Sequence, residues 1–240
     1  MLYLQELLDD LSYGETSGLA VTNPITDTDI IKNHARIFSL INNGLLDLYT
    51  RFKIKEKEFD LYQRADKSLY YVRAAYLGDP GAGDSEVYID GTGDDPPAGD
   101  IIRFLEAYDA DGVEVRINNP KYPYDIFTYE PDVIKLVQEE DADLRVISLV
   151  YQAAYPKINI EDDEDPETYA LYFPTYLKKA LLLSIAATLY RGKSSKASEQ
   201  GNLSNTYLYQ YELEINKIKE LGLLPDKTST STNFEMNGWI

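Results

Sequence analysis

The sequence predicts an α+β protein in which helices from both ends of the chain form one bundle and a β-rich domain is inserted between them. Two patterns favour this fold: apolar residues recur at helical spacing near both ends of the chain, whereas they alternate with polar residues in the middle. The 240 residues are therefore expected to form N-terminal helices of the bundle (1–53), a β-rich insert (54–158), C-terminal helices of the bundle (159–225) and a C-terminal tail (226–240).

Two helices are expected in the N-terminal segment. The spacing of the first leucines predicts a short helix over residues 2–11. A second helix begins near Asp27 or Thr28, which are good N-caps, and runs to about Phe52. Its packing seam, which repeats every seven residues, consists of Ile31, Phe38, Leu45 and Phe52, with His34, Ile41 and Leu48 at the alternate positions.

Short strands are expected in the insert, at residues 56–62, 68–76, 102–108, 113–117, 126–129, 133–137 and 144–151. The clearest is 113–117, where three β-branched residues alternate with Glu114 and Arg116. Before it, Asp109–Gly112 predicts a hairpin turn. This turn is similar to the start of a calcium loop, but the spacing of the remaining ligands fails, so no metal is expected there.

Two segments are strongly acidic. Residues 78–100 hold six Gly, three Pro and seven acidic residues without any Lys or Arg, which predicts a flexible acidic loop with room for a short strand around Val87–Ile89. Residues 161–167 form a second acidic run. We expect this run to be a solvated surface, because its acids lack the spacing and the turns of a cation site.

Two further helices are expected in the C-terminal segment. The first spans residues 175–191, follows Pro174 and is apolar on nearly all sides. The second spans residues 203–221 and ends at Gly222. The residues expected on its buried face are Leu208, Tyr211, Ile215 and Ile218.

The composition argues against several classes of function. With 23 basic and 41 acidic residues the net charge is −18, which argues against a protein that wraps nucleic acid through its phosphates. Because the chain has no cysteine and a single histidine, His34, it lacks a thiol nucleophile, a thiolate metal site and a multi-histidine site. We expect His34 to be structural, and we expect no cofactor and no metal. Among the 41 acids, a carboxylate pair for glycoside hydrolysis stays open, although no particular pair stands out.

No membrane span is expected. The most apolar stretch, 180–190, is about half of the roughly 20 residues that a spanning helix requires, and basic residues flank it closely.

Tyrosine is unusually frequent, at 21 residues. Such rings with a polar tip either fill a β-rich core or supply contact area at an interface, and the sequence leaves both readings open. With no catalytic cluster in the sequence, they favour an assembly component over an enzyme.

The tail combines a Ser/Thr-rich link, residues 226–232, with large apolar side chains. These side chains either fold back onto the chain's own helices or, as we favour, anchor on a partner. The expected interface residues are Phe234, Met236, Trp239 and Ile240.

Several stretches carry a family resemblance: residues 4–17 (LQELLDDLSYGETS), 41–52 (INNGLLDLYTRF) with Lys55-Glu-Lys57, 150–156 (VYQAAYP) and 234–240. They resemble the head-to-tail adaptor, or connector, proteins of short-tailed bacteriophages. The resemblance implies a structural virion protein, not an enzyme, with a helical bundle and a β-rich domain. It implies a ring, usually of twelve copies, that lies beneath the portal, lines the DNA channel and provides the platform for tail attachment.

The same resemblance implies a set of partners and a location. The partners are further copies of the chain, the portal protein, the tail tube or nozzle protein and tail fibres, with only non-specific contact with passing double-stranded DNA. The location is the head–tail junction of the virion, after synthesis in the host cytoplasm. A channel lined with carboxylates would let DNA pass during ejection without sticking, which suits the negative charge. Two alternatives are a tail-associated cell-wall hydrolase that uses a carboxylate pair and a module that recruits tail fibres.

Overall fold

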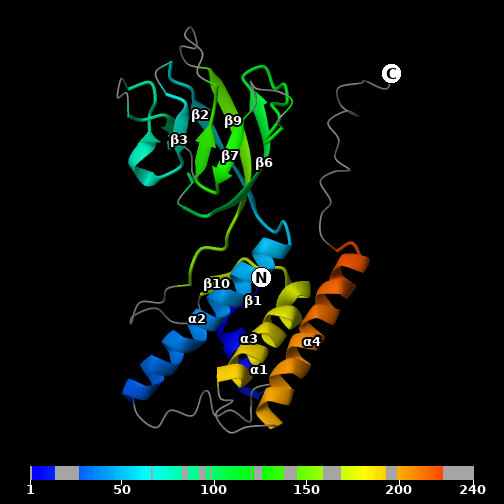
Figure 1. Cartoon of the computed structure of the whole chain (residues 1–240). Coiled ribbons are helices and arrows are strands. Elements are labelled where there is room, and N and C mark those ends of the chain that lie inside the picture. Colours follow the sequence, from blue (N-terminus) through cyan, green and yellow to red (C-terminus); the bar gives the residue numbers. More distant parts are fainter. Residues whose placement is uncertain are drawn as a thin grey trace, which may run out of the picture. The chain divides into compact units, whose positions relative to one another are not determined.

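The computed structural model describes residues 2–13, 27–65, 67–82, 86–91, 96–97, 99–119, 121, 126–137, 145–158, 169–192 and 199–223. Across these residues the protein is mixed α+β, with four α-helices and three β-sheets, so the predicted class is confirmed (Figure 1). The chain divides into a first unit, residues 1–48 and 157–240, and a second unit, residues 49–156. None of the described helices is long and apolar enough to cross a membrane.

The first unit contains nearly all of the helical structure. Its elements are α1 (Leu4–Tyr13), α2 (Asp27–Arg51, with its last turn in the second unit), a 3-10 turn (Thr175–Leu177) that leads into α3 (Lys178–Gly192), and α4 (Glu199–Glu220). The first helix starts later than predicted, because Leu2–Tyr3 form a strand, β1, that pairs antiparallel with β10 (Ala170–Leu171). The Leu4 N–H then donates to the Tyr169 carbonyl, which joins α1 to this small sheet.

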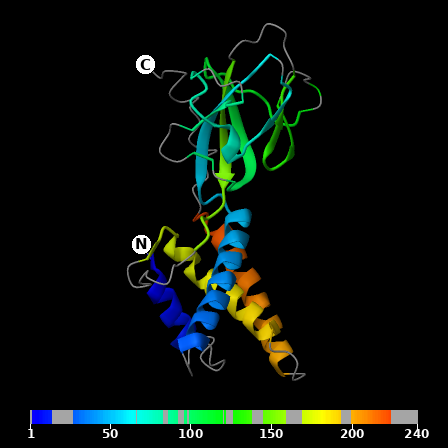
Figure 2. The same ribbon diagram turned by 90° about the vertical axis from the view of Figure 1, so that its left-hand side faces the viewer.

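Helix α3 is the centre of the first unit. Its residues Ala180, Leu181 and Ala186 are fully buried, as an all-round apolar helix requires. In Figures 1 and 2, α4 runs alongside α3 and α2 crosses it. On the α1 side, the Nζ atom of Lys178 lies 2.5 Å from carboxylate oxygens of both Glu6 and Asp10.

The buried stripe of α2 differs in part from the predicted seven-residue seam. Leu45, Leu48 and Phe52 are buried as expected, but Ile37 is buried where Phe38 was predicted, and Phe38 is only half-buried. The reason is that a straight helix has 3.6 residues per turn and drifts away from a strict seven-residue repeat. The side chains of Ile31 and His34 lie outside the described part of the structure.

On α4 the predicted buried face also needs one correction. Tyr211, Ile215 and Ile218 are buried, but Leu208 is 39% exposed. Ser204 lies in the buried row instead, and its hydroxyl donates to the Ala187 carbonyl of α3 at 2.8 Å. Serine is small, and its hydroxyl has a hydrogen-bond partner here, so it fits the close contact between α3 and α4.

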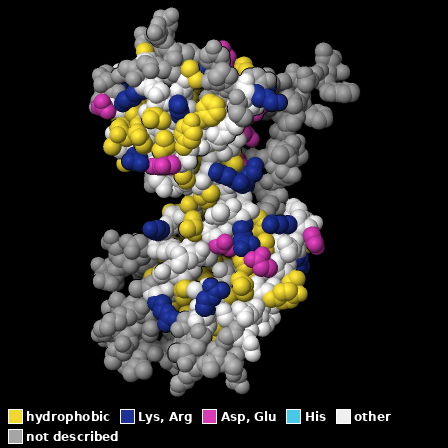
Figure 3. Space-filling model, in the orientation of Figure 1, with side chains coloured by type: hydrophobic (Ala, Val, Ile, Leu, Met, Phe, Trp, Pro, Cys, Tyr) yellow, Lys and Arg dark blue, Asp and Glu magenta, His cyan; other side chains and the backbone are white. Residues whose placement is uncertain are grey.

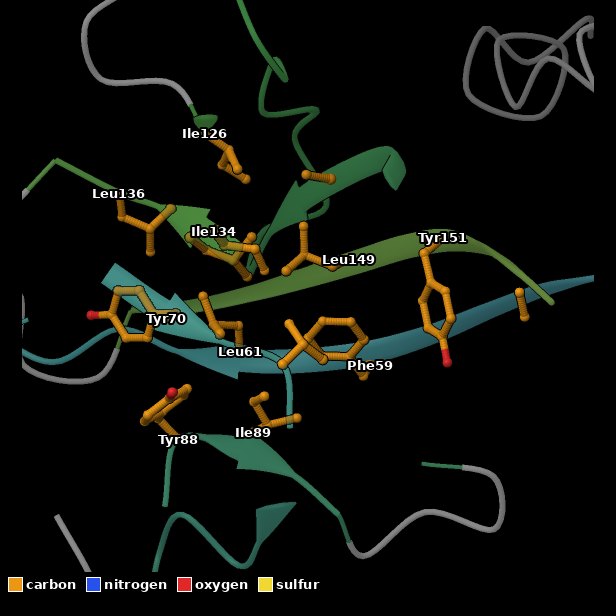
Figure 4. Close-up of a cluster of buried hydrophobic side chains, with 14 residues drawn as sticks. Phe59, Leu61, Tyr70, Tyr88, Ile89, Ile126, Ile134, Leu136, Leu149 and Tyr151 are labelled. Atoms are coloured by element: carbon orange, nitrogen blue, oxygen red, sulfur yellow. The ribbon is translucent and has the colours of Figure 1, made fainter. Parts of the chain in front are cut away.

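The second unit consists of two sheets. The five-stranded sheet has the order β4 (Leu77–Gly78), β5 (Ile89–Asp90), β2 (Glu56–Tyr62), β9 (Val146–Ala153), β6 (Ile101–Asp109). The three-stranded sheet has the order β3 (Leu69–Tyr71), β8 (Val133–Lys135), β7 (Phe127–Glu130). Figure 4 shows their shared core, in which Leu61 and Leu149 of the larger sheet meet Tyr70 and Ile134 of the smaller one. Each sheet therefore buries one face in this core.

Two strand predictions in this unit are confirmed only in part. Residues 113–117 form isolated bridges and no regular strand, although the Asp109 N–H donates to the Val113 carbonyl and the Val115 N–H donates to the Ala107 carbonyl, which pairs them with β6 as expected. The turn itself closes as predicted, with the Gly112 N–H on the Asp109 carbonyl. The strand expected at 68–76 stops at Tyr71, after which residues 74–76 form a 3-10 turn.

Within the segment 78–100, which was expected to be a flexible acidic loop, the structure contains a short strand. Its residues Ile89–Asp90 form β5, and both Tyr88 and Ile89 are buried in the core. Apolar side chains in an otherwise acidic segment thus anchor it to the sheet. Flexibility remains a prediction for the rest of the segment, part of which (83–85, 92–95 and 98) lies outside the described residues.

Candidate interaction surfaces

The residues predicted to form an interface lie outside the described part of the chain. These are Phe234, Met236, Trp239 and Ile240. The acidic run 161–167 is also outside it. Within the described ranges, no group of three or more His, Asp or Glu residues is placed to hold a metal ion.

The carboxylates that lie near the cores have structural partners. Asp60 accepts from the hydroxyl of Ser148 on the neighbouring strand. Asp100 forms an ion pair with Lys57 at 2.8 Å and accepts from Tyr151 at 3.2 Å. Both carboxylates thus join neighbouring segments of the five-stranded sheet.

The outer face of the three-stranded sheet is unusually apolar. Because successive side chains of a strand point to opposite faces, Tyr70 and Ile134, which fill the core, fix the direction of their neighbours. The opposite face contains a set that we call the aromatic face: Leu69, Tyr71, Phe127, Tyr129 and Lys135. The register of β7 shifts between Thr128 and Glu130, so Tyr129 is assigned to this face by its ring, whose centre lies 5.9 Å from Lys135 Nζ. Glu130, which pairs with Val133, lies on the same side. The pairing places Leu69 beside Lys135 and Lys135 beside Phe127, which makes one row across all three strands.

Much of the aromatic face is open to solvent. Tyr129 is 68% exposed and Leu69 is 44% exposed. Figure 3 shows hydrophobic side chains gathered over the region of β3 and β7, with both basic and acidic side chains beside them. Contiguous exposed apolar surface of this kind is a candidate contact site.

Basic groups accompany the rings of the aromatic face. The Nζ atom of Lys135 lies 5.9 Å from the centre of the Tyr129 ring, and the guanidinium carbon of Arg73 lies 4.9 Å from the centre of the Tyr71 ring. Arg73 is held in place by Asp132, with 2.9 Å between Nε and a carboxylate oxygen. This face therefore combines apolar surface with charges of both signs, because Lys135 and Arg73 are accompanied by Asp132 and Glu130.

Side chains cover backbone groups at both edges of the same sheet. On β3, the Tyr88 hydroxyl accepts the Tyr71 N–H at 2.9 Å and donates to the Tyr71 carbonyl at 3.1 Å. Burial raises the pKa of Tyr88 above its ordinary value, so this hydroxyl stays protonated and able to donate. On β7, the Asn118 side chain accepts the Thr128 N–H and donates to the Thr128 hydroxyl, each at 2.8 Å.

A second exposed apolar surface lies on the first unit. Tyr209 and Leu213 are one helical turn apart on the side of α4 opposite its buried row, and they are 66% and 50% exposed. We call this pair the outer face of α4.

Sequence reasoning missed both surfaces, although a signal was present. In residues 69–71 the apolar side chains are consecutive, so both faces of the strand are apolar instead of one. The apolar residues of α4 likewise include Tyr209 and Leu213, which do not fit the single stripe of a half-buried helix.

The chain matches no protein-family model, and a search of curated protein sequences found no match either. The functional proposal therefore rests on these surfaces together with the sequence resemblance.

Proposed function

We propose that this chain is a structural head-to-tail adaptor of a short-tailed bacteriophage. Copies of it form a ring beneath the portal, line the DNA channel and provide the platform for the tail, so the protein works at the head–tail junction of the virion. Its partners are further copies of the chain, the portal protein and a tail tube or nozzle protein. It performs no catalysis in this role.

The observation that carries the proposal is that each of the two units keeps an apolar surface exposed. The second unit has the aromatic face, and the first unit has Tyr209 and Leu213 on α4. Apolar surface left in water is unfavourable by about 25 cal/mol per Å², so two such surfaces on separate units favour a protein that is held by partners at both. A protein at the head–tail junction needs contact surfaces for more than one partner.

The finer architecture belongs to the same proposal. Helices from both ends of the chain would form one bundle that carries the β-rich domain as an insert. The packing of α1, α2 and α4 on α3 supports this arrangement, as does the uninterrupted run of the second unit from residue 49 to residue 156.

The charge of the chain suits a DNA channel. With a net charge of −18 per copy, a ring repels the phosphates of passing DNA and holds it only by non-specific contact.

The experiment that tests the proposal measures particle mass for the purified chain alone and mixed with purified portal rings of the same phage. A ring of twelve 27.3 kDa copies has a mass of about 330 kDa, so the portal particle should gain about this mass, even if the chain alone is monomeric. The same mixture at high salt is the control for purely electrostatic association. If the chain neither forms a ring nor adds mass to the portal, the adaptor proposal is wrong.

A further inference from the structure

We propose that the aromatic face of the three-stranded sheet is the docking site for residues 233–240 of a neighbouring copy of this chain. The inference rests on the proposed function in one respect, because the neighbouring copy is the next subunit of the proposed ring. It proposes which segment binds the exposed surface of the second unit and where the apolar tail binds.

The geometry favours docking across the face over addition of a strand at an edge. Outward-pointing backbone groups on both edge strands are already bonded: those of Tyr71 to the Tyr88 hydroxyl and the N–H of Thr128 to Asn118. An added strand would have to displace these hydrogen bonds. Leu69 and Tyr129, in contrast, are exposed side chains on the two edge strands β3 and β7, and an occupant that crosses the face would bury both.

The tail segment complements this face in apolar character. In an extended conformation Phe234 and Met236 would point to the same side, about 7 Å apart, so both side chains could contact the aromatic face. Aromatic side chains gain additional contact energy when they meet other rings in offset or edge-to-face geometry.

One basic group of the aromatic face can meet the acidic side chain of the segment. Residues 233–240 contain Glu235 and no basic residue, and Lys135 lies at the Tyr129 ring, whereas Arg73 is already paired with Asp132. Salt weakens an exposed contact of this kind, so the apolar side chains carry most of the proposed docking.

A link of defined length joins the described chain to the segment. Nine residues, 224–232, follow the last described residue, and a chain of this length spans up to about 30 Å when it is extended. A tail on one copy and a face on the next are two different, complementary surfaces. Such head-to-tail contacts are the kind that close a ring.

Trp239 gives a direct readout, because it is the single tryptophan of the chain. The experiment measures Trp239 emission and acrylamide quenching in the full chain, at concentrations at which it assembles, and again after dilution to the monomer. Docking should shift the emission to the blue and protect Trp239 in the assembled form, and both effects should be lost on dilution.

Single substitutions then locate the site. Tyr129→Ser and Leu69→Ser, on opposite edge strands, should each abolish the blue shift and the protection. Val113→Ser is the matched control, because Val113 is 61% exposed in the same unit but lies at the hairpin turn, outside the sheet. Melting curves followed by circular dichroism show whether each variant remains folded.

The remaining outcomes contradict the inference. Protection that persists in the monomer means that the tail folds onto its own chain. Protection that appears only when portal rings are added, and that Tyr129→Ser and Leu69→Ser both keep, means that the tail binds the portal, which would leave the adaptor proposal intact while overturning this one. An unchanged emission in both face variants means that the tail binds elsewhere.

Discussion

Gly44 of α2 lies so close to Leu181 of α3 that a Cβ atom at residue 44 would stand 2.7 Å from the Cδ1 atom of Leu181. The same position would be 3.7 Å from the Ser184 hydroxyl and 3.8 Å from Ile185. Leu181 is fully buried, so its side chain has little room to move away. The glycine is thus what allows α2 and α3 to cross at this distance.

Replacing this glycine should therefore weaken the first unit in proportion to the size of the new side chain. Gly44→Leu should lower the free energy of unfolding by about 1–3 kcal/mol, because overpacking forces the helices apart. Gly44→Ala should cost less, since alanine gains about 1 kcal/mol of helix propensity against the clash. Urea unfolding followed by helical circular dichroism measures both, and equal stability of the leucine variant and the natural protein would contradict this account.

Gln152 of β9 stabilises the C-terminal turn of α2. Its Nε2 atom donates to the carbonyl oxygens of Tyr49 and Phe52, the latter at 2.9 Å, and its Oε1 atom accepts from Arg103 Nε at 2.8 Å. The last carbonyls of a helix have no partner within the helix, so this side chain adds hydrogen bonds at the end of α2, beside the bond from the Ile54 N–H to the Phe52 carbonyl.

Gln152→Leu keeps a similar volume but removes these hydrogen bonds, and should cost about 1–3 kcal/mol of stability. The matched control is Gln5→Leu on α1, because Gln5 bonds only to Asp9 on the surface and should change stability by less than about 0.5 kcal/mol. Chemical unfolding of the two variants side by side makes the comparison. Equal effects at the two positions would refute the capping role of Gln152.

Buried tyrosines predict a loss of stability at high pH. Burial raises the pKa of both Tyr49 and Tyr88 above the ordinary 10.0, and a hydrogen bond to Glu106, followed by burial, raises the pKa of Tyr108 to about 12. A phenol whose pKa is higher in the folded state than in the unfolded state stabilises the fold fully below pH 10. That contribution is lost as the pH rises from 10 through the folded-state pKa.

The free energy of unfolding should thus fall progressively above about pH 10. In Tyr88→Phe, which has no ionisable hydroxyl at this position, the fall should be shallower, although the variant starts lower because Tyr71 loses its hydrogen bonds. Denaturant unfolding at a series of pH values gives both slopes. Identical slopes for the variant and the natural protein would exclude Tyr88 as a contributor.

The outer face of α4 should matter for assembly and not for folding. Tyr209→Ser with Leu213→Ser removes two exposed side chains, so stability should change by less than about 0.5 kcal/mol per site. The same double variant should lower the fraction of chain bound to portal rings or to other copies, as measured by particle mass. Asn202→Ser, on the same exposed side of the helix, is the polar control, and a double variant that assembles as well as this control would remove α4 from the proposed contacts.

Strong local periodicity is what made parts of this fold predictable. β2 occupies residues 56–62 as expected, and α2, α3 and α4 match their predicted ranges to within four residues, because each carries its own pattern over several turns or a full strand. The pairing of Leu2 with Leu171 has no such signal, because two residues are too few for a pattern and their partner is distant in the chain. At 113–117 the local pattern predicted the pairing with β6 but not that it would stop at isolated bridges.

The candidate surfaces could be predicted only in part. The tail could be predicted as an interface from composition, because large apolar side chains that follow a Ser/Thr-rich link are visible in the sequence alone. The aromatic face was not, because it joins Leu69 to Phe127 through Lys135, and that row exists only once the register of three strands is known.

The central claim, that this chain is an adaptor at the head–tail junction, is tested most directly by its copy number in purified phage particles. Quantitative peptide mass spectrometry, with labelled standards for this chain and for the portal protein, measures both in one sample. The account predicts equal molar amounts of the two proteins, because one ring of twelve copies would lie beneath one dodecameric portal. Absence of the chain from particles that contain portal protein would contradict the account.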